Sequence, residues 1–133
     1  MNLKIGIKKF TKVSREKILE DSSLLVQSGF QTKVFKCDAD IAVIGGAMGS
    51  GKSYALILEV MKHIGDPYFR CGIFRKARGN IVCTGGLWEE LLDVAYTSGY
   101  SVKTNKHQLT ITFPSGATVQ FGHSNHPNFK EYL

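Results

Sequence analysis

The sequence predicts an α/β fold in which a mainly parallel sheet is flanked by helices and carries an antiparallel hairpin. Three patterns lead to this expectation. The apolar run Ile41-Ala42-Val43-Ile44 precedes a glycine-rich turn and a segment with apolar residues at helical spacing. A further apolar stretch over 69–74 completes the order strand, helix, strand of a parallel pair. Two later stretches alternate apolar and polar residues on either side of a turn, as hairpin strands do.

The helices are expected where one apolar stripe repeats at helical spacing. The first two cover 14–27 and 31–37, and the third covers 54–64 and ends at Gly65-Asp66-Pro67. A fourth is expected over 86–98, because Gly99 ends its pattern. The strand over 40–44 has a continuous apolar core, which favours a central strand buried on both faces.

The hairpin is expected over 109–121, where Pro114-Ser115-Gly116 separates two alternating stretches. Residues 3–7 also alternate, which fits either a short edge strand or a loosely held tail. The three cysteines are widely spaced and fit neither a disulfide framework nor a metal site, so we expect reduced core residues.

The composition is that of an ordinary globular domain. With 133 residues the chain can form a single core, and no apolar run approaches the ~18 residues that a membrane span needs. No secretory signal is recognisable, so a cytosolic location is expected. The net charge of +6 favours a polyanionic partner, either nucleotide or nucleic acid, although a solvated basic face gives the same sum.

The glycine-rich turn is a complete GxxxxGK[ST] motif. Its glycines permit positive φ angles, so that backbone N–H groups can surround a polyphosphate next to a helix N-terminus. Lys52 would reach the β- and γ-phosphates and Ser53 would ligate Mg²⁺, which predicts a P-loop NTPase fold that binds ATP and Mg²⁺. The alternative is a glycine-rich turn that binds nothing. The residues of the predicted site are Gly46, Ala47, Met48, Gly49, Ser50, Gly51, Lys52 and Ser53.

The acidic strand that supports hydrolysis in such enzymes is not recognisable. It would be an apolar strand that ends in Asp, but Glu89, Glu90 and Asp93 lie in a helical pattern. Asp38 and Asp40 precede a strand rather than end one. We therefore expect nucleotide binding and an incomplete ATPase domain, and truncation is the simplest explanation.

The order of several motifs resembles the large subunit of tailed-bacteriophage terminases, from about residue 30 to residue 133. The most specific motif is TFPSGATVQFGH at 112–123, placed after the GLWEE helix at 86–90. The others are Phe30-Gln31, the apolar run and loop from Ile41 to Ser53 with Tyr54 after it, and Ile73-Phe74-Arg75-Lys76.

This resemblance implies a motor that uses ATP to package viral double-stranded DNA into procapsids. It implies an extension over 1–29 and the amino-terminal part of an ATPase domain over 30–133, without the nuclease domain that cuts DNA in this family. The acidic magnesium strand follows in the family shortly after the point where this sequence ends. The implied partners are DNA, a portal protein, the small terminase subunit and a ring of like subunits in the host cytoplasm.

The resemblance also implies roles for single residues. Gln31 lies where a family glutamine contacts adenine, and the alternative is a solvent-facing helix residue. Many family members have an arginine at the position of Met48. Arg75, with Arg78 behind it, is therefore the next candidate for a catalytic arginine, and a surface cation or a contact to the DNA backbone is the alternative for each.

Two other classes of protein remain as alternatives. One is a different P-loop NTPase, helicase-like or a nucleotide kinase, although no arginine-bearing segment typical of a kinase is evident after residue 100. The other is a nucleotide-binding module that does not hydrolyse ATP.

Overall fold

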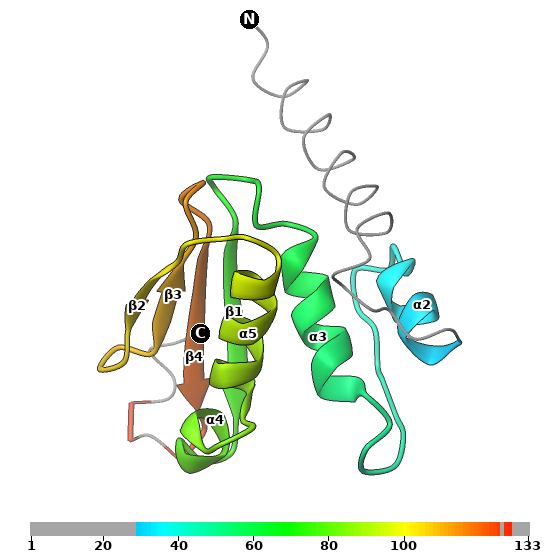
Figure 1. The fold of residues 1–133 in the computed structure, drawn as a ribbon. Coiled ribbons are helices and arrows are strands. Elements are labelled where there is room, and N and C mark those ends of the chain that lie inside the picture. Colours follow the sequence, from blue (N-terminus) through cyan, green and yellow to red (C-terminus); the bar gives the residue numbers. More distant parts are fainter. Residues whose placement is uncertain (1–28, 126, 129–133) are drawn as a thin grey trace, which may run out of the picture.

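The computed structural model describes residues 29–125 and 127–128 and has two layers, a sheet and a set of helices (Figure 1). The expected tail or strand at 3–7 and the expected helix over 14–27 lie outside the described residues. In chain order the elements are α2 (Phe30–Phe35), α3 (Lys52–Met61), β1 (Arg70–Arg75), α4 (Gly79–Val82), α5 (Leu87–Thr97), β2 (Lys103–Asn105), β3 (Thr110–Thr112) and β4 (Thr118–His123).

The sheet has the strand order β1-β4-β3-β2 and is mixed. β1 and β4 are parallel, with Ile73 opposite Phe121, whereas β4 pairs antiparallel with β3, and β3 with β2. The α/β class is thus confirmed. The expectation of a mainly parallel sheet is wrong for the described residues, because only one of the three strand pairs is parallel.

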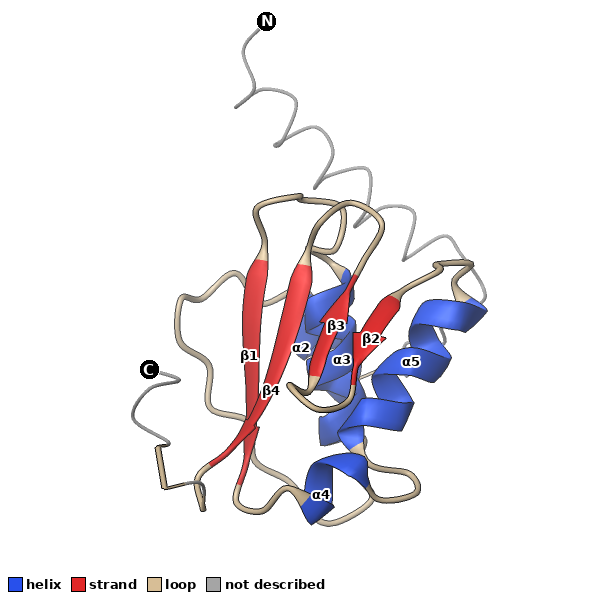
Figure 2. Cartoon of the chain, turned by 90° about the vertical axis from the view of Figure 1, so that its left-hand side faces the viewer, coloured by secondary structure: helices blue, strands red, loops and turns tan. Residues whose placement is uncertain are grey.

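The helices α2, α3 and α5 lie on one side of the sheet (Figure 2). The core forms where α3 and α5 meet the inward residues of β1, β3 and β4. Alternation along β4 places Val119 and Phe121 in this core, as period-2 patterning predicts. Burial of each large apolar side chain stabilises the fold by about 1.5–3 kcal/mol. The core therefore fixes α3, and with it the loop before α3, against the sheet.

The segment 40–44 is not a strand, so the prediction of a buried central strand is wrong. Ile41 and Val43 are 86% and 97% exposed, and the segment belongs to the irregular connection between α2 and α3 (Figure 1). The reason lies in pairing: a strand needs a neighbour for its N–H and C=O groups, and none of the described strands pairs with these residues. Without such a neighbour the apolar run cannot form the hydrogen bonds of a sheet.

The other predicted elements are confirmed with small shifts in their bounds. The helix expected over 54–64 begins earlier, at Lys52, and the strand expected over 69–74 covers 70–75. The hairpin turns as expected, because the Gly116 N–H donates to the Phe113 carbonyl at 2.9 Å and Gly116 has a φ of 102°. The short helix α4 and the strand β2 are not predicted by the sequence patterns.

The cysteines agree with the expectation in one respect only. All three are free, but Cys37 and Cys83 are exposed and Cys71 is half-buried, so the prediction of core residues is wrong for the first two. Cys37 follows the end of α2 and Cys83 follows α4, outside the faces that pack on the sheet.

Candidate phosphate-binding site

The loop from Gly46 to Ser53 has the backbone conformation that its glycines allow. Gly46, Gly49 and Gly51 have φ angles of 152°, 79° and 79°, in the range that other residues rarely adopt. A Cβ atom at Gly46 would lie 2.8 Å from Ser50 Oγ, so a side chain here would also require the Ser50 hydroxyl to move. The predicted loop is therefore a defined, compact turn.

The side chain of Lys52 folds back into this loop. Its Nζ donates to the carbonyl oxygens of Gly46 and Ala47, each at 2.5 Å, and to Ser50 Oγ at 3.0 Å. All three acceptors are neutral. A positive charge is thus held at the centre of the loop by acceptors that a phosphate oxygen, which is charged, can replace with stronger hydrogen bonds.

The helix α3 begins at Lys52 and adds to this positive field. Its N-cap is Gly51, which has no side chain to accept from the first turn, and the first intrahelical bond joins Ala55 N–H to the Gly51 carbonyl at 3.0 Å. The N–H groups before Ala55 therefore have no intrahelical acceptor, as at every helix start. These N–H groups and the helix dipole favour an anion at the same place as the Lys52 ammonium.

Arg75, at the end of β1, reaches the same place from another element. Its Nη2 donates to Ser53 Oγ at 3.2 Å. A cleft of about 330 Å³ lies between the 42–44 segment, the start of α3 and the end of β1, and it is lined by Ala42, Ile44, Lys52, Ser53, Leu56 and Arg75. The structure thus brings together two candidate cations, Lys52 and Arg75, that are 23 positions apart.

Arg78 does not belong to this cleft. Its Nη2 donates to the Lys106 carbonyl at 2.9 Å in the turn between β2 and β3. This bond accounts for Arg78 as a structural residue that ties the segment after β1 to the hairpin. Met48 is fully exposed at the tip of the loop.

Gln31, on α2, contacts the last glycine of the loop. The side chain is 3% exposed, and its Nε2 donates to the Gly51 carbonyl at 3.4 Å. The alternative of a solvent-facing residue is therefore wrong, because α2 packs this face against α3. A contact with adenine remains a prediction, while the contact with the phosphate loop is a feature of the structure.

Glu90 does not line the cleft, but its carboxyl interacts electrostatically with Arg75, which does. It lies in the first turn of α5, where burial raises the pKa of its carboxyl and the positive charge of Arg75 opposes this shift only in part. Burial and the charge of Glu90 together raise the pKa of the Tyr54 hydroxyl. The GLWEE motif contains both Glu89 and Glu90, but it does not indicate that Glu90 is the more buried of the two. Glu89 accepts from the Gly85 N–H at 3.0 Å.

The described residues contain no group of three or more His, Cys, Asp or Glu side chains that could hold a metal ion by themselves. Ser53 supplies one hydroxyl oxygen at the cleft. This fits Mg²⁺ that arrives with a nucleotide, since Mg²⁺ in such sites is held mostly by phosphate oxygens and water with one or two protein ligands.

No helix in the described part of the chain has both the length and the apolar character that crossing a bilayer requires.

Comparison of the chain with models of known protein families, with curated proteins and with solved structures gives no match.

Proposed function

We propose that this chain binds ATP with Mg²⁺ at the loop from Gly46 to Ser53, and that it is the ATP-binding part of a terminase large subunit. The observation that carries the proposal is the position of Lys52. Its ammonium lies inside a loop with three left-handed glycines, at the N-terminus of a ten-residue helix. Each of these features favours a phosphate group there.

In the proposed complex the chain's residues have separate tasks. Lys52 exchanges its loop carbonyls for oxygens of the β- and γ-phosphates, and the loop N–H groups hold the rest of the polyphosphate. The Ser53 hydroxyl, which accepts from Arg75 in the free chain, would serve as a ligand to Mg²⁺. Mg²⁺ supplies positive charge that neutralises the phosphates.

Arg75 is the proposed catalytic arginine. Its guanidinium already lies at Ser53, so it can contact an anion in the cleft without movement of β1. The carboxyl group of Glu90 is close enough to interact with the charge of Arg75, and this interaction favours a guanidinium held near the loop. Positively charged side chains at a transferring phosphoryl group stabilise the charge that develops there.

The packaging role rests on the resemblance in sequence, from the loop to the TFPSGATVQFGH motif. From this resemblance we propose that the partners are double-stranded viral DNA, a portal protein and the small terminase subunit. We also propose that the full-length protein forms a homo-oligomeric ring and acts in the host cytoplasm. The net charge of +6 is compatible with an anionic polymer as partner.

ATP binding is tested by titration of the purified chain with a fluorescent ATP analogue in the presence of Mg²⁺. We expect saturable binding by the natural sequence and by Lys103→Ala, whose side chain is exposed on β2 at the far edge of the sheet from β1. Binding should be lost in Lys52→Ala. Equal affinity in all three proteins would contradict the phosphate-loop assignment.

The terminase assignment has its own test, which is independent of affinity. We expect the coding region around this sequence to contain an apolar strand ending in Asp-Glu and, further on, a cluster of nuclease acids. A chain that binds ATP, shows no turnover and has no such regions nearby would instead be a nucleotide-binding module. Unwinding of duplex DNA would favour the helicase-like alternative.

A further inference from the structure

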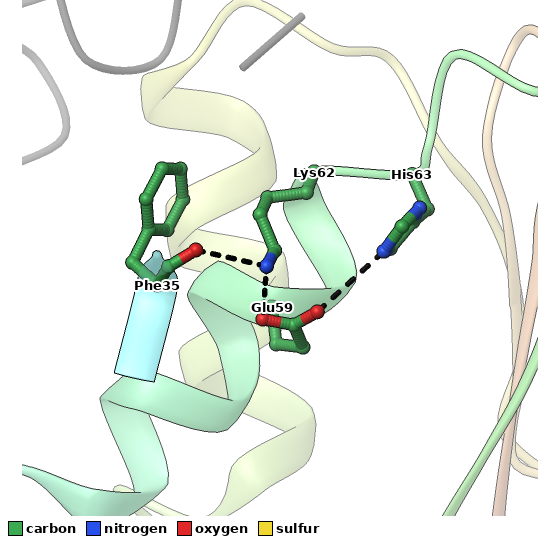
Figure 3. A network of polar contacts seen from close by, with 4 residues as sticks. All are labelled: Phe35, Glu59, Lys62 and His63. Atoms are coloured by element: carbon green, nitrogen blue, oxygen red, sulfur yellow. Dashed lines mark hydrogen bonds and ion pairs between the residues drawn. The ribbon is translucent and has the colours of Figure 1, made fainter. Parts of the chain in front are cut away.

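The other end of α3 holds a buried lysine that the proposed chemistry does not use. Lys62 is 1% exposed and follows the last residue of the helix. Its Nζ lies 2.5 Å from Glu59 Oε2 and donates to the Phe35 carbonyl at 3.0 Å (Figure 3). The same ammonium lies 5.2 Å from the centre of the Phe35 ring.

A buried ammonium destabilises a fold unless it is paired, and an apolar side chain of similar size is often more stable in its place. The pairs of Lys62 are specific. Glu59 lies one turn back on α3, but the carbonyl of Phe35 belongs to the last turn of α2. Carbonyls in the last turn of a helix have no intrahelical donor, so Lys62 supplies the donor that Phe35 needs. The cation therefore joins two helices.

The helix α2 depends on such contacts because it has only six residues. Isolated helices shorter than about 12 residues are marginal in water. Its carboxyl end is held by Lys62 and by burial of the Phe35 ring. Its amino end reaches the phosphate loop, where the Gln31 amide donates to the Gly51 carbonyl at 3.4 Å. Contacts from α2 thus reach the residues at both ends of α3, Gly51 before it and Lys62 after it.

We propose that Lys62 is a positioning residue for the nucleotide site: by holding the carboxyl end of α2, it keeps Gln31 on the carbonyl of Gly51. This inference rests on the proposed ATP binding. Gly51 is the left-handed N-cap from which α3 and Lys52 begin. Lys62 acts on this point from about 16.5 Å away, which is the length of eleven helical rises along α3. Without the tether, the backbone at Gly51 is less ordered in the free chain. ATP binding must then order it, and this cost lowers the affinity for ATP.

The test is a double-mutant cycle between Lys62→Met and Gln31→Leu, with ATP affinity as the readout. Lys33→Met is the matched control, because Lys33 is exposed on the same helix. We expect each single variant to lose about fivefold in affinity, and the double variant to lose no more than the larger single loss, since both changes break one tether. Additive losses, or unchanged affinity in Lys62→Met, would overturn the proposal.

A second readout needs no nucleotide. Hydrogen exchange in the peptides covering 30–36 and 51–58 should be faster in Lys62→Met than in Lys33→Met, because α2 opens and the Ala55 N–H bond to Gly51 loosens. Faster exchange confined to 30–36 would show a local structural role and would overturn the proposal. If the natural sequence binds no ATP, the proposed function is wrong, and this exchange experiment still decides whether the tether exists.

Glu59→Gln provides the test if Lys62→Met does not fold. This variant leaves the lysine in place and removes the negative charge of its partner on α3. We expect a smaller loss of ATP affinity, about threefold, that is absent in a Gln31→Leu background. The same loss in both backgrounds would mean that Lys62 does not act through Gln31.

Discussion

The two ends of α3 each carry a lysine, and the two side chains are held in opposite ways. Lys52, at the start, is partly exposed and its ammonium contacts three neutral oxygens of one loop. Lys62, after the last residue, is buried and contacts a carboxylate, a carbonyl from another helix and an aromatic ring. The first set of partners can be exchanged for a ligand, whereas the second set holds the fold.

Under the proposed function, one residue type serves binding at one end of α3 and architecture at the other. The difference comes from burial and from the charge of the partners. A neutral carbonyl competes poorly with a phosphate oxygen, but a buried ammonium that leaves its carboxylate stays shielded from water as an unpaired charge, which is costly. Substitutions at the two ends should therefore separate affinity from stability.

Lys52→Ala is expected to have the largest effect, and almost all of it on affinity. The variant should lose at least about 100-fold in ATP affinity, equivalent to about 3 kcal/mol of charged contacts to phosphate. Its stability in urea should change by less than about 0.5 kcal/mol, because two of the lost hydrogen bonds are exposed and the third is only partly buried. A large fall in stability together with intact binding would reverse the roles that we assign to the two ends.

Lys62→Ala is expected to reduce mainly the stability of the fold, and the ATP affinity much less. It should lower the free energy of unfolding by about 2 kcal/mol, because a buried side chain is lost and the Phe35 carbonyl loses its donor. Urea unfolding followed by circular dichroism measures this change. Lys33→Ala is the control on the exposed side of α2, and equal stabilities of the two variants would contradict the structure of the network.

Gly46→Ala tests the loop itself, with Gly45→Ala as a control one residue away. At Gly46 a Cβ atom meets Ser50 Oγ and the φ of 152° opposes a side chain, whereas at Gly45 nothing lies within 4 Å. We expect about a tenfold loss of ATP affinity in the first variant only, since strain of this kind costs ~1–3 kcal/mol. Titration with the fluorescent analogue distinguishes them, and similar losses in both would argue against a loop fitted to phosphate.

The smallest expected effect is the contribution of the Glu59 carboxylate to the pH dependence of stability. Burial alone would raise the pKa of Glu59, but hydrogen bonds from His63 and Lys62 and their charges outweigh it and lower the pKa. Cys71 on β1 also interacts with this carboxylate. Because the pKa is lower in the folded chain, the stabilisation is present above the ordinary value of 4.5 and is lost as the pH falls through the folded value.

The difference should be less than about 1 kcal/mol, because the carboxylate is partly exposed. Urea unfolding at about pH 6 and about pH 3.5 measures it. Glu59→Gln should lose less stability on acidification than the natural sequence or Asp93→Asn, an exposed control on α5. A steeper loss in Glu59→Gln would mean that the sign of the pKa shift is wrong.

The sequence predicts the conformation of the glycine-rich loop better than the sheet, and the reason is physical. The loop conformation depends on local rules: glycine at positive φ, a lysine within reach and a helix start. The hairpin around Gly116 follows equally local rules. The strand over 40–44 depends instead on a neighbour far away in the chain, and apolar composition says nothing about whether that neighbour exists.

The sequence also does not predict the contacts of single side chains with residues far away in the chain. A lysine at position 62 after an apolar stripe gives no sign that it points inward, since burial of Lys62 depends on where α2 docks. The same holds for Glu90, whose electrostatic interaction with Arg75 depends on how α5 and β1 are placed in the fold. The location of Arg75 near the loop could be expected, because it depends only on the residue standing at the carboxyl end of a strand.

The central claim, that the loop end of α3 binds nucleotide and the Lys62 end does not, is tested most directly by hydrogen exchange with and without ATP and Mg²⁺. We predict strong protection in the peptide over 46–55, weaker protection over 30–36 through Gln31, and no change around Glu59 to Ile64. Protection centred on the Lys62 end, or no protection at the loop under conditions where the analogue is bound, would contradict the account.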